Sequence, residues 1–291
     1  NSRPIKKMTR QLLWLVPLLF LILFFFIPLA KILGVMISKE GAVSTSAILK
    51  PLGFTFWQAG LSTLLTFVVG LPAAYLFSHF NFAGKKALRL IVTLPFILPT
   101  VVVAAGFNAL LGPRGWLNLF LMNSFDLSSP PISLINTLGA ILLAHVFYNT
   151  SILIRVVGTS WGSLDNDMKE AAQVLGGSPL NVFRKVTLPL LRPSLLAAGL
   201  LVFLFDFTSF GVILLLGGPG FSTLETAIYT QTLSMLNLRM AGVLSLVQIT
   251  CTLLVMLFYA KVNEKRPPAL KPGKGVNPLK PSGVSQKIFV D

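Results

Sequence analysis

Six long stretches with almost no charged residues constrain the fold more than any other feature of this chain. They cover residues 12–30, 51–78, 90–113, 127–154, 193–224 and 240–260, and Asp206 is the one charge inside them. A helix needs about 20 mainly apolar residues to cross a bilayer. The sequence therefore predicts an all-α integral membrane protein with six transmembrane helices.

The first stretch follows four basic residues, Arg3, Lys6, Lys7 and Arg10. Its uncharged run is longer than the apolar core of a cleaved signal peptide, so we expect a retained first span. We divide the chain into an N-terminal segment (1–11), a membrane domain (12–262) and a basic, proline-rich tail or linker (263–291).

The distribution of lysine and arginine predicts the orientation. With an even number of spans and the N-terminus inside, the inner segments hold 19 of the 24 Lys and Arg residues. Basic residues concentrate in cytoplasmic loops. We therefore expect both termini and residues 163–189 to lie in the cytoplasm, and the net charge of +15 to report membrane topology and not nucleic-acid binding.

Composition excludes several kinds of site. Only 11% of residues are charged, against about 25% in soluble domains. Cys251 is the single cysteine, and His79 and His145 are the only histidines, so no metal-ligand spacing occurs. No GxxxxGK[ST] loop is present, so we expect this chain to bind no ATP or other cofactor itself.

Residues 163–189 form a charged segment that predicts two short helices between apolar stretches. Asp165 is a candidate N-cap, and Met168, Ala171, Ala172 and Leu175 share one helical face. Gly176 and Gly177 end that helix, and Ser178 with Pro179 starts the second, whose apolar stripe is Val182, Phe183 and Val186. A compact helical hairpin on a membrane surface is a shape that another protein can bind.

The same segment resembles the EAA loop of permease subunits of ATP-binding-cassette importers. Glu170-Ala171-Ala172, Gly176 and Val186-Thr187-Leu188-Pro189 match the pattern EAA, three residues, Gly, nine residues, Ile-x-Leu-Pro, with Val186 in place of Ile. The stretches FWQAGLST, LLAHVFYN, LGGPG and LETAIY are similar to the thiamine and ferric-iron permease group.

The resemblance implies a binding-protein-dependent importer in the bacterial inner membrane. A periplasmic or lipoprotein binding protein would deliver the substrate, and a cytoplasmic ATPase dimer with bound ATP-Mg would receive the coupling helices of the EAA loop. The implied coupling residues are Glu170, Ala171, Ala172, Gly176, Leu188 and Pro189. The resemblance also implies a second permease half or subunit, so we expect the chain to be either the first half of a longer protein or a separate subunit.

Polar residues in the fourth and fifth stretches are candidates for the translocation path. His145 and Asn149 lie in one, and Asp206 and Ser209 in the other. Charged side chains inside a membrane face the bundle interior or water. Two interpretations stay open for Asp206. It is either a structural residue, with a hydrogen bond to the fourth span or a protonated carboxyl group, or a residue that lines the path.

Two further features concern helix geometry. Pro72, Pro95 and Pro99 predict kinks in the second and third spans, which either shape packing or flex during gating. After the glycines at 217–220, Ser222 and Glu225 predict a capping box before a short outer helix over residues 224–236. That outer segment is a candidate gate, docking surface or simple connection.

The substrate is the least constrained feature. Asp206 in the path favours a neutral or cationic ligand, which fits thiamine or ferric iron better than an anion. Polyamine and other small-solute importers share the EAA loop. A secondary transporter that uses Asp206 and His145 as a proton relay is the alternative from a different class, and a membrane-embedded enzyme is the third.

Overall fold

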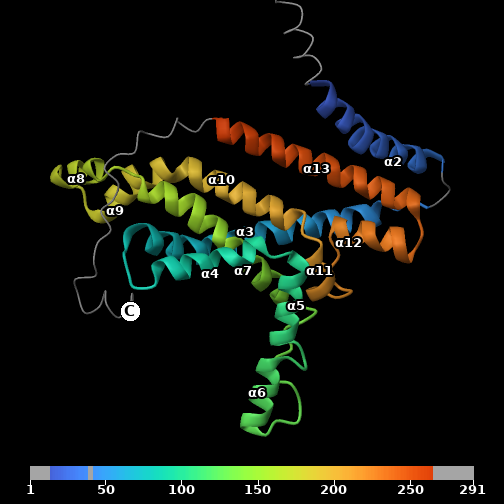
Figure 1. Cartoon of the computed structure of the whole chain (residues 1–291), viewed down its shortest axis with the longest axis horizontal. Coiled ribbons are helices and arrows are strands. Elements are labelled where there is room, and N and C mark those ends of the chain that lie inside the picture. The colour runs from blue at the N-terminus through green and yellow to red at the C-terminus, as the bar shows by residue number, and fades with distance from the viewer. Residues whose placement is uncertain (1–13, 39–41, 265–291) are drawn as a thin grey trace, which may run out of the picture.

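The computed structural model describes residues 14–38 and 42–264, and these ranges are helical with no β-strand. Residues 14–21 are helical and continue into the next elements (Figure 1). The elements in chain order are η1 (Ile22–Phe26), α2 (Ile27–Ser38), α3 (Thr45–His79), α4 (Lys85–Ile97), α5 (Thr100–Leu111), α6 (Trp116–Phe125), α7 (Leu138–Gly162), α8 (Asn166–Val174), α9 (Pro179–Val182), η2 (Phe183–Thr187), α10 (Leu188–Phe207), α11 (Gly211–Leu216), α12 (Leu224–Tyr229), η3 (Thr230–Ser234) and α13 (Leu238–Glu264).

Five helices of the described part are long and apolar enough to cross a membrane, or six if one bent pair counts as a span. The five are Trp14–Ile37, Thr45–His79, Leu138–Gly162, Pro179–Phe207 and Leu238–Asn263, and the bent pair is Lys85–Ile97 with Thr100–Phe125. The expected all-α membrane fold is confirmed, and the expected number of spans agrees with the upper count. The N-terminal segment 1–11 and almost all of the tail 263–291 lie outside the described residues.

The third span departs from the expected run over residues 90–113. The chain bends by 109° between the two halves of this span, and the break lies at Leu98 and Pro99. Pro95 stays inside α4, whereas Pro99 precedes the first residue of α5. The residue before a proline is disfavoured in the helical conformation, and Leu98 is extended with ψ 141°. The expected kink is therefore a full break.

The fourth and fifth spans also begin or end at other residues than the sequence indicated. The fourth was expected over 127–154, but α7 begins at Leu138 with Thr137 as its N-cap and ends at Gly162. The fifth was expected to reach residue 224, but α10 ends at Phe207, and α11 is a separate helix. Apolar composition indicated that these spans exist, whereas it carried no signal for where the backbone leaves the helix.

The centre of the bundle is the packing of α3 against α7, with α10 on both. A Cβ at Gly70 would lie 2.7 Å from a Leu153 methyl, and one at Gly158 would lie 3.3 Å from the Ala74 carbonyl oxygen. Small residues allow membrane helices to approach closely, which van der Waals packing requires where the hydrophobic effect is weak. The buried residues of this core include Ala74, Leu153, Val157 and Leu191.

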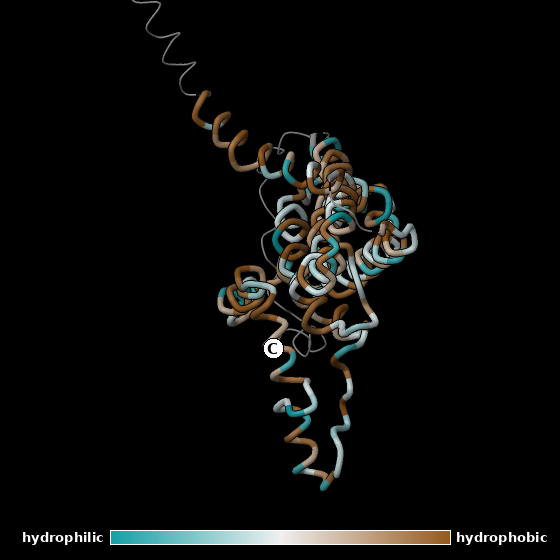
Figure 2. Tube along the Cα trace, turned by 90° about the vertical axis from the view of Figure 1, so that its right-hand side faces the viewer, coloured by the Kyte–Doolittle hydropathy of each residue, from teal (hydrophilic) through white to brown (hydrophobic). Residues whose placement is uncertain are grey.

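Two parts extend away from this core. The N-terminal helix packs on α13, and Figure 2 shows it apolar along most of its length. The arm formed by α5, α6 and the following loop projects to the other side (Figure 1). Asn118 holds the arm together, because its amide donates to the carbonyl oxygens of Gly112 and Ile132 at 2.8 and 2.9 Å and accepts from Ile132 N at 2.9 Å.

Candidate functional site: a helical hairpin and an intramembrane polar cluster

The expected hairpin is present at one end of the bundle, where α8 and α9 project beyond the spans (Figure 1). The Asp165 side chain accepts a hydrogen bond from Asp167 N at 3.0 Å, so the predicted N-cap is confirmed. At the other end of α8, Gly176 has φ +83°, its N–H donates to Gln173 O, and the Gly177 N–H donates to Ala172 O. These two bonds are the Schellman pattern, which satisfies carbonyls that a helix end leaves free.

Gly177 is a second requirement of this turn, and the family motif does not contain it. A Cβ at this position would lie 2.6 Å from the Ala172 carbonyl oxygen and 3.1 Å from a Val182 methyl. Gly176 has open space around it but a left-handed backbone conformation. Gly176 is therefore required for its backbone conformation, and Gly177 because there is no space for a side chain.

The second helix of the hairpin continues into the fifth span. Ser178 caps it by accepting from Asn181 N at 3.4 Å, and Pro179 is its first residue. One continuous helix then runs from Pro179 to Phe207. Leu188 and Pro189, two of the implied coupling residues, lie inside this helix. Pro189 has no N–H to donate to the carbonyl oxygen four residues earlier. The π-helical turn η2 lies directly before it, and there the Leu188 N–H donates to Phe183 O. This wider turn accommodates the missing bond.

Several apolar residues of the hairpin are exposed in the described chain. Val174 and Leu175 are 87% and 88% exposed, Leu180 is 64% exposed and Met168 is 49% exposed. Of the expected stripe on the second helix, Val182 is buried and Phe183 is exposed. Ala171 is exposed and Ala172 half-buried, so the small side chains leave the α8 backbone open to close approach.

The charges next to these residues differ in their surroundings. Glu170 is exposed and forms no salt bridge within the described residues. Lys169 is half-buried on the same helix, and this burial lowers the pKa of its ammonium. Glu170 is thus an acidic group of the hairpin that a second protein can reach, as is the exposed Asp167 at the start of the same helix.

An aromatic cluster lies at the base of the hairpin. The Trp161 ring, at the end of α7, lies 5.2 Å from the Tyr75 ring, 5.6 Å from the His79 ring and 6.1 Å from the Phe183 ring, measured between centroids. Tyr75 and His79 belong to α3 and Phe183 to η2. The cluster therefore joins the hairpin to the two central spans.

The four candidate path residues come together in a second place, inside the bundle. Asn149 Nδ2 donates to Asp206 Oδ1 at 2.6 Å, and His145 Nδ1 lies 3.4 Å from the same oxygen. His145 Nε2 lies 2.9 Å from Ser209 Oγ. All four side chains are buried.

Two residues of α3 complete this cluster, and sequence reasoning missed both. Gln58 Nε2 donates to the Asp206 backbone oxygen at 2.7 Å, and Ser62 Oγ lies 3.0 Å from His145 Nδ1. Both are fully buried. Their helical spacing of four residues, on a helix that is otherwise mostly apolar, is the signal that could have found them.

A cavity of about 190 Å³ lies beside the cluster, at the point where two spans are interrupted. Its walls include Thr100 and Val101 at the start of α5, and Thr208 and Gly211 between α10 and α11. A Cβ at Gly211 would lie 2.9 Å from a Val101 methyl and 3.0 Å from Thr100 Oγ1, so the two interrupted spans touch here. Sites in membrane transporters often lie where helices are discontinuous.

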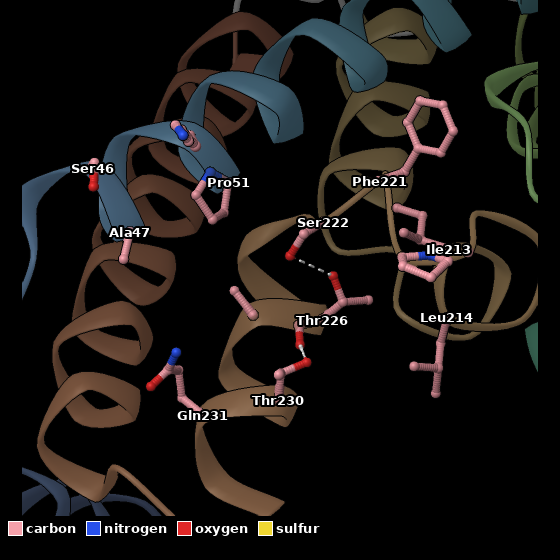
Figure 3. Close-up of a pocket in the computed structure, with 14 residues that line it drawn as sticks. Ser46, Ala47, Pro51, Ile213, Leu214, Phe221, Ser222, Thr226, Thr230 and Gln231 are labelled. Carbon is pink, nitrogen blue, oxygen red and sulfur yellow. Dashed lines mark hydrogen bonds between the residues drawn. The ribbon is translucent and has the colours of Figure 1, made fainter. Parts of the chain in front are cut away.

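A larger hollow of about 790 Å³ lies between the start of α3, the loop after α11 and α12 (Figure 3). The expected helix after residue 224 is confirmed as α12 and η3. The expected capping box of Ser222 and Glu225 is wrong. Thr223 is the N-cap and Thr226 its partner, since the Glu225 carboxylate instead accepts from Gln248 of α13 at 3.0 Å.

Comparison with known proteins identifies the family. Residues 66–266 match the binding-protein-dependent transport system inner membrane component. The chain belongs to this family. Membership confirms the resemblance drawn from the hairpin sequence, and the several long apolar helices agree with a multi-pass inner membrane component.

Curated relatives of this inner membrane component differ in the substrate that their names state. A thiamine transport system permease protein of Haemophilus influenzae is 35% identical over 206 residues, which are 70% of this chain and 38% of that protein. A putative 2-aminoethylphosphonate transport system permease protein of Salmonella typhimurium is 28% identical over 265 residues, 86% of this chain and 91% of that protein. The chain thus spans about two fifths of the thiamine permease and about nine tenths of the other relative.

Solved structures share the fold. A chain of a bacterial alginate ABC transporter, in complex with an alginate-bound periplasmic protein, superposes with a TM-score of 0.70 at 20% identity, covering 91% of this chain and 98% of that chain. A chain of the MetNI methionine ABC transporter gives 0.54 at 17% identity, covering 76% and 96%. At these identities the likeness concerns the fold of the inner membrane component alone.

Proposed function

We propose that this inner membrane component forms half of the translocation path of an ATP-binding-cassette importer and couples to a cytoplasmic ATPase through the hairpin of residues 163–189. The observation that carries the proposal is the exposed apolar tip of α8 and α9, fixed by a Schellman turn and an N-cap on each helix. Solvated apolar side chains on a well-defined turn favour a protein partner over a free loop. ATP-Mg would bind to that partner.

The continuous helix from Pro179 to Phe207 supplies the mechanical connection. It begins in the hairpin and reaches the polar cluster at Asp206, and its 29 residues span about 43 Å. A displacement of the hairpin by the ATPase therefore moves one wall of the intramembrane cluster directly. On this account His145, Asn149, Asp206 and Ser209 line the path, and the Trp161 cluster transmits the same displacement to α3 and α7.

The side of the membrane on which each end of the molecule lies indicates where the binding protein would dock. The basic residues near the hairpin support a cytoplasmic location for that end by the positive-inside rule. The hollow between α3, α11 and α12 then lies on the outer face, where a periplasmic or lipoprotein binding protein would dock. A second permease half or subunit would close the path.

Thiamine is the substrate that we propose, because the thiamine permease relatives are the more similar in sequence. A 2-aminoethylphosphonate permease is the second candidate, since that relative matches over nearly its whole length. Ferric iron, polyamines and other small solutes have less support. A secondary transporter that uses Asp206 would require no ATPase at all, which separates that class by experiment.

The test is capture of partners by the tagged full-length chain from native membranes in mild detergent. We expect an ATPase subunit to be recovered, and to be lost with Glu170→Lys and with Gly176→Val while the chain remains in the membrane. Leu236→Lys, at an exposed position outside the hairpin, is the matched control and should retain the ATPase. Recovery of the intact chain without any ATPase, even after crosslinking, would favour the secondary transporter.

A further inference from the structure

The intramembrane cluster leaves three oxygen atoms without a hydrogen-bond partner. They are Gln58 Oε1, Asn149 Oδ1 and Asp206 Oδ2, one from each of α3, α7 and α10. None of the three side chains is more than 1% exposed. A buried polar atom without a partner is unfavourable, so such atoms are rare, and three around one carboxyl group require an explanation.

The two amide oxygens are acceptors, and their orientation is fixed by their neighbours, whereas Asp206 Oδ2 is an acceptor when its carboxyl group is ionised. Asn149 turns its amide nitrogen to Asp206 Oδ1, and Gln58 turns its amide nitrogen to the Asp206 backbone oxygen. A backbone carbonyl can only accept, so turning the Gln58 amide around would set oxygen against oxygen. The groups missing from the cluster are therefore hydrogen-bond donors.

The ionisable groups around the cluster also favour a positively charged ligand. Asp206 is the only acidic residue that lines the adjoining cavity, and neither lysine nor arginine lines it. His145, at 3.4 Å, is the only basic side chain in salt-bridge contact with this carboxyl among the described residues. A carboxylate in a low-dielectric interior is stabilised by a cation that also donates hydrogen bonds.

We propose that Gln58, Asn149 and Asp206 form a binding site for a nitrogen cation that carries N–H donors, such as the ammonium group of a transported molecule. This identification of the ligand class rests on the proposed function, whereas the donor requirement rests on the cluster alone. Of the two substrate candidates, 2-aminoethylphosphonate carries such an ammonium group, whereas the charged thiazolium nitrogen of thiamine has no N–H. The three oxygens are closed to water in this structure. Access to them requires α10 to move relative to α3 and α7, and α10 is the helix that begins in the hairpin.

The first experiment measures cation binding to the full-length chain in lipid nanodiscs by saturation-transfer NMR. The probes are methylammonium, which has a charge and N–H donors, and tetramethylammonium, which has the charge alone. We expect methylammonium to bind and tetramethylammonium to bind at least about tenfold more weakly, the difference that one charge-assisted hydrogen bond produces. Asp206→Asn should weaken methylammonium binding at least as much, and Asp126→Asn, at an exposed carboxyl in the arm, should leave it unchanged.

The second experiment does not depend on access to the site. Asp206→Asn keeps the side-chain shape and places a donor among the unpartnered acceptors, so the ligand-free variant should unfold at the same or a higher temperature than the wild type. A lower unfolding temperature would show that the carboxyl group is a satisfied structural partner and would overturn the proposal. Equal binding of both probes, or of neither, would also overturn it.

Capture of the ATPase separates this proposal from the proposed function. If the chain captures an ATPase and fails both experiments above, the importer assignment stands and the cation site is wrong. If it binds methylammonium as expected but captures no ATPase, the cation site stands and the ATP-driven mechanism is wrong.

Discussion

At the residue scale, the turn after α8 shows how two neighbouring glycines meet different demands. The left-handed φ of Gly176 is the one that the motif encodes. The close approach of Gly177 to the Ala172 carbonyl is specific to the three-dimensional turn. Both are needed because the Schellman pattern places the second glycine against the carbonyl to which its own N–H donates.

Gly177→Ala tests the steric part of this argument. The added methyl would lie 2.6 Å from the Ala172 backbone oxygen, which cannot move independently of the helix. We expect the hairpin to lose about 1–3 kcal/mol of local stability. ATPase capture should fall several-fold, whereas the global unfolding temperature changes little. Gly220→Ala, where nothing lies within 4 Å of the new Cβ, is the matched control. Unchanged capture by Gly177→Ala would contradict the assigned role of the turn.

The same scale explains what the sequence could and could not predict of the site. The N-caps Asp165 and Ser178 and the stop at Gly176 depend on local backbone chemistry, and all three are confirmed. Gln58 and Ser62 were missed because their role depends on which face of α3 meets α7, and a single mostly apolar helix does not encode that choice. The polar character of His145 and Asp206 was visible, but their contact required the fold.

At the element scale, two interrupted spans meet beside the polar cluster. The break at Pro99 and the end of α10 at Phe207 bring the starts of α5 and α11 into contact. Both breaks fall inside apolar runs that the sequence indicated to be continuous spans. Hydropathy reports how apolar the residues are and carries no information on the direction of the backbone, so it did not indicate the breaks. Their coincidence at one cavity favours a functional reason for the interruption.

Gly211→Val tests this contact between elements. The larger side chain would collide with Thr100 and Val101 at 2.9–3.2 Å, and one of these contacts is to backbone nitrogen. We expect a loss of about 1–3 kcal/mol in stability, because overpacking forces the two helices apart. Gly106→Val, on α5 with open space around the new Cβ, should be close to neutral. Thermal unfolding in detergent measures both, and equal effects of the two changes would contradict the packing described here.

At the scale of the whole molecule, the two candidate surfaces lie toward opposite ends of the spans. The hairpin is at one end, and the hollow between α3, α11 and α12 is toward the other (Figure 1). The charge distribution predicted that the hairpin end is cytoplasmic. Helix number and class were accessible to sequence reasoning because lipid imposes them on composition.

Labelling by a membrane-impermeant maleimide tests this orientation. In a Cys251→Ser background, we expect Pro219→Cys to react in intact spheroplasts and Leu175→Cys to react only after lysis. Both positions are exposed, so their intrinsic accessibility does not differ greatly. The reverse pattern would place the hairpin outside and exclude contact with a cytoplasmic ATPase.

The central claim, that the hairpin tip contacts an ATPase, is tested most directly by site-specific photocrosslinking in native membranes. A photoreactive amino acid at Val174 should give an adduct with an ATP-binding-cassette ATPase, because this side chain is 87% exposed at the tip of α8. The same amino acid at Leu236, 74% exposed outside the hairpin, should give none. Absence of the ATPase adduct at Val174, or an equal yield at both positions, would contradict the account.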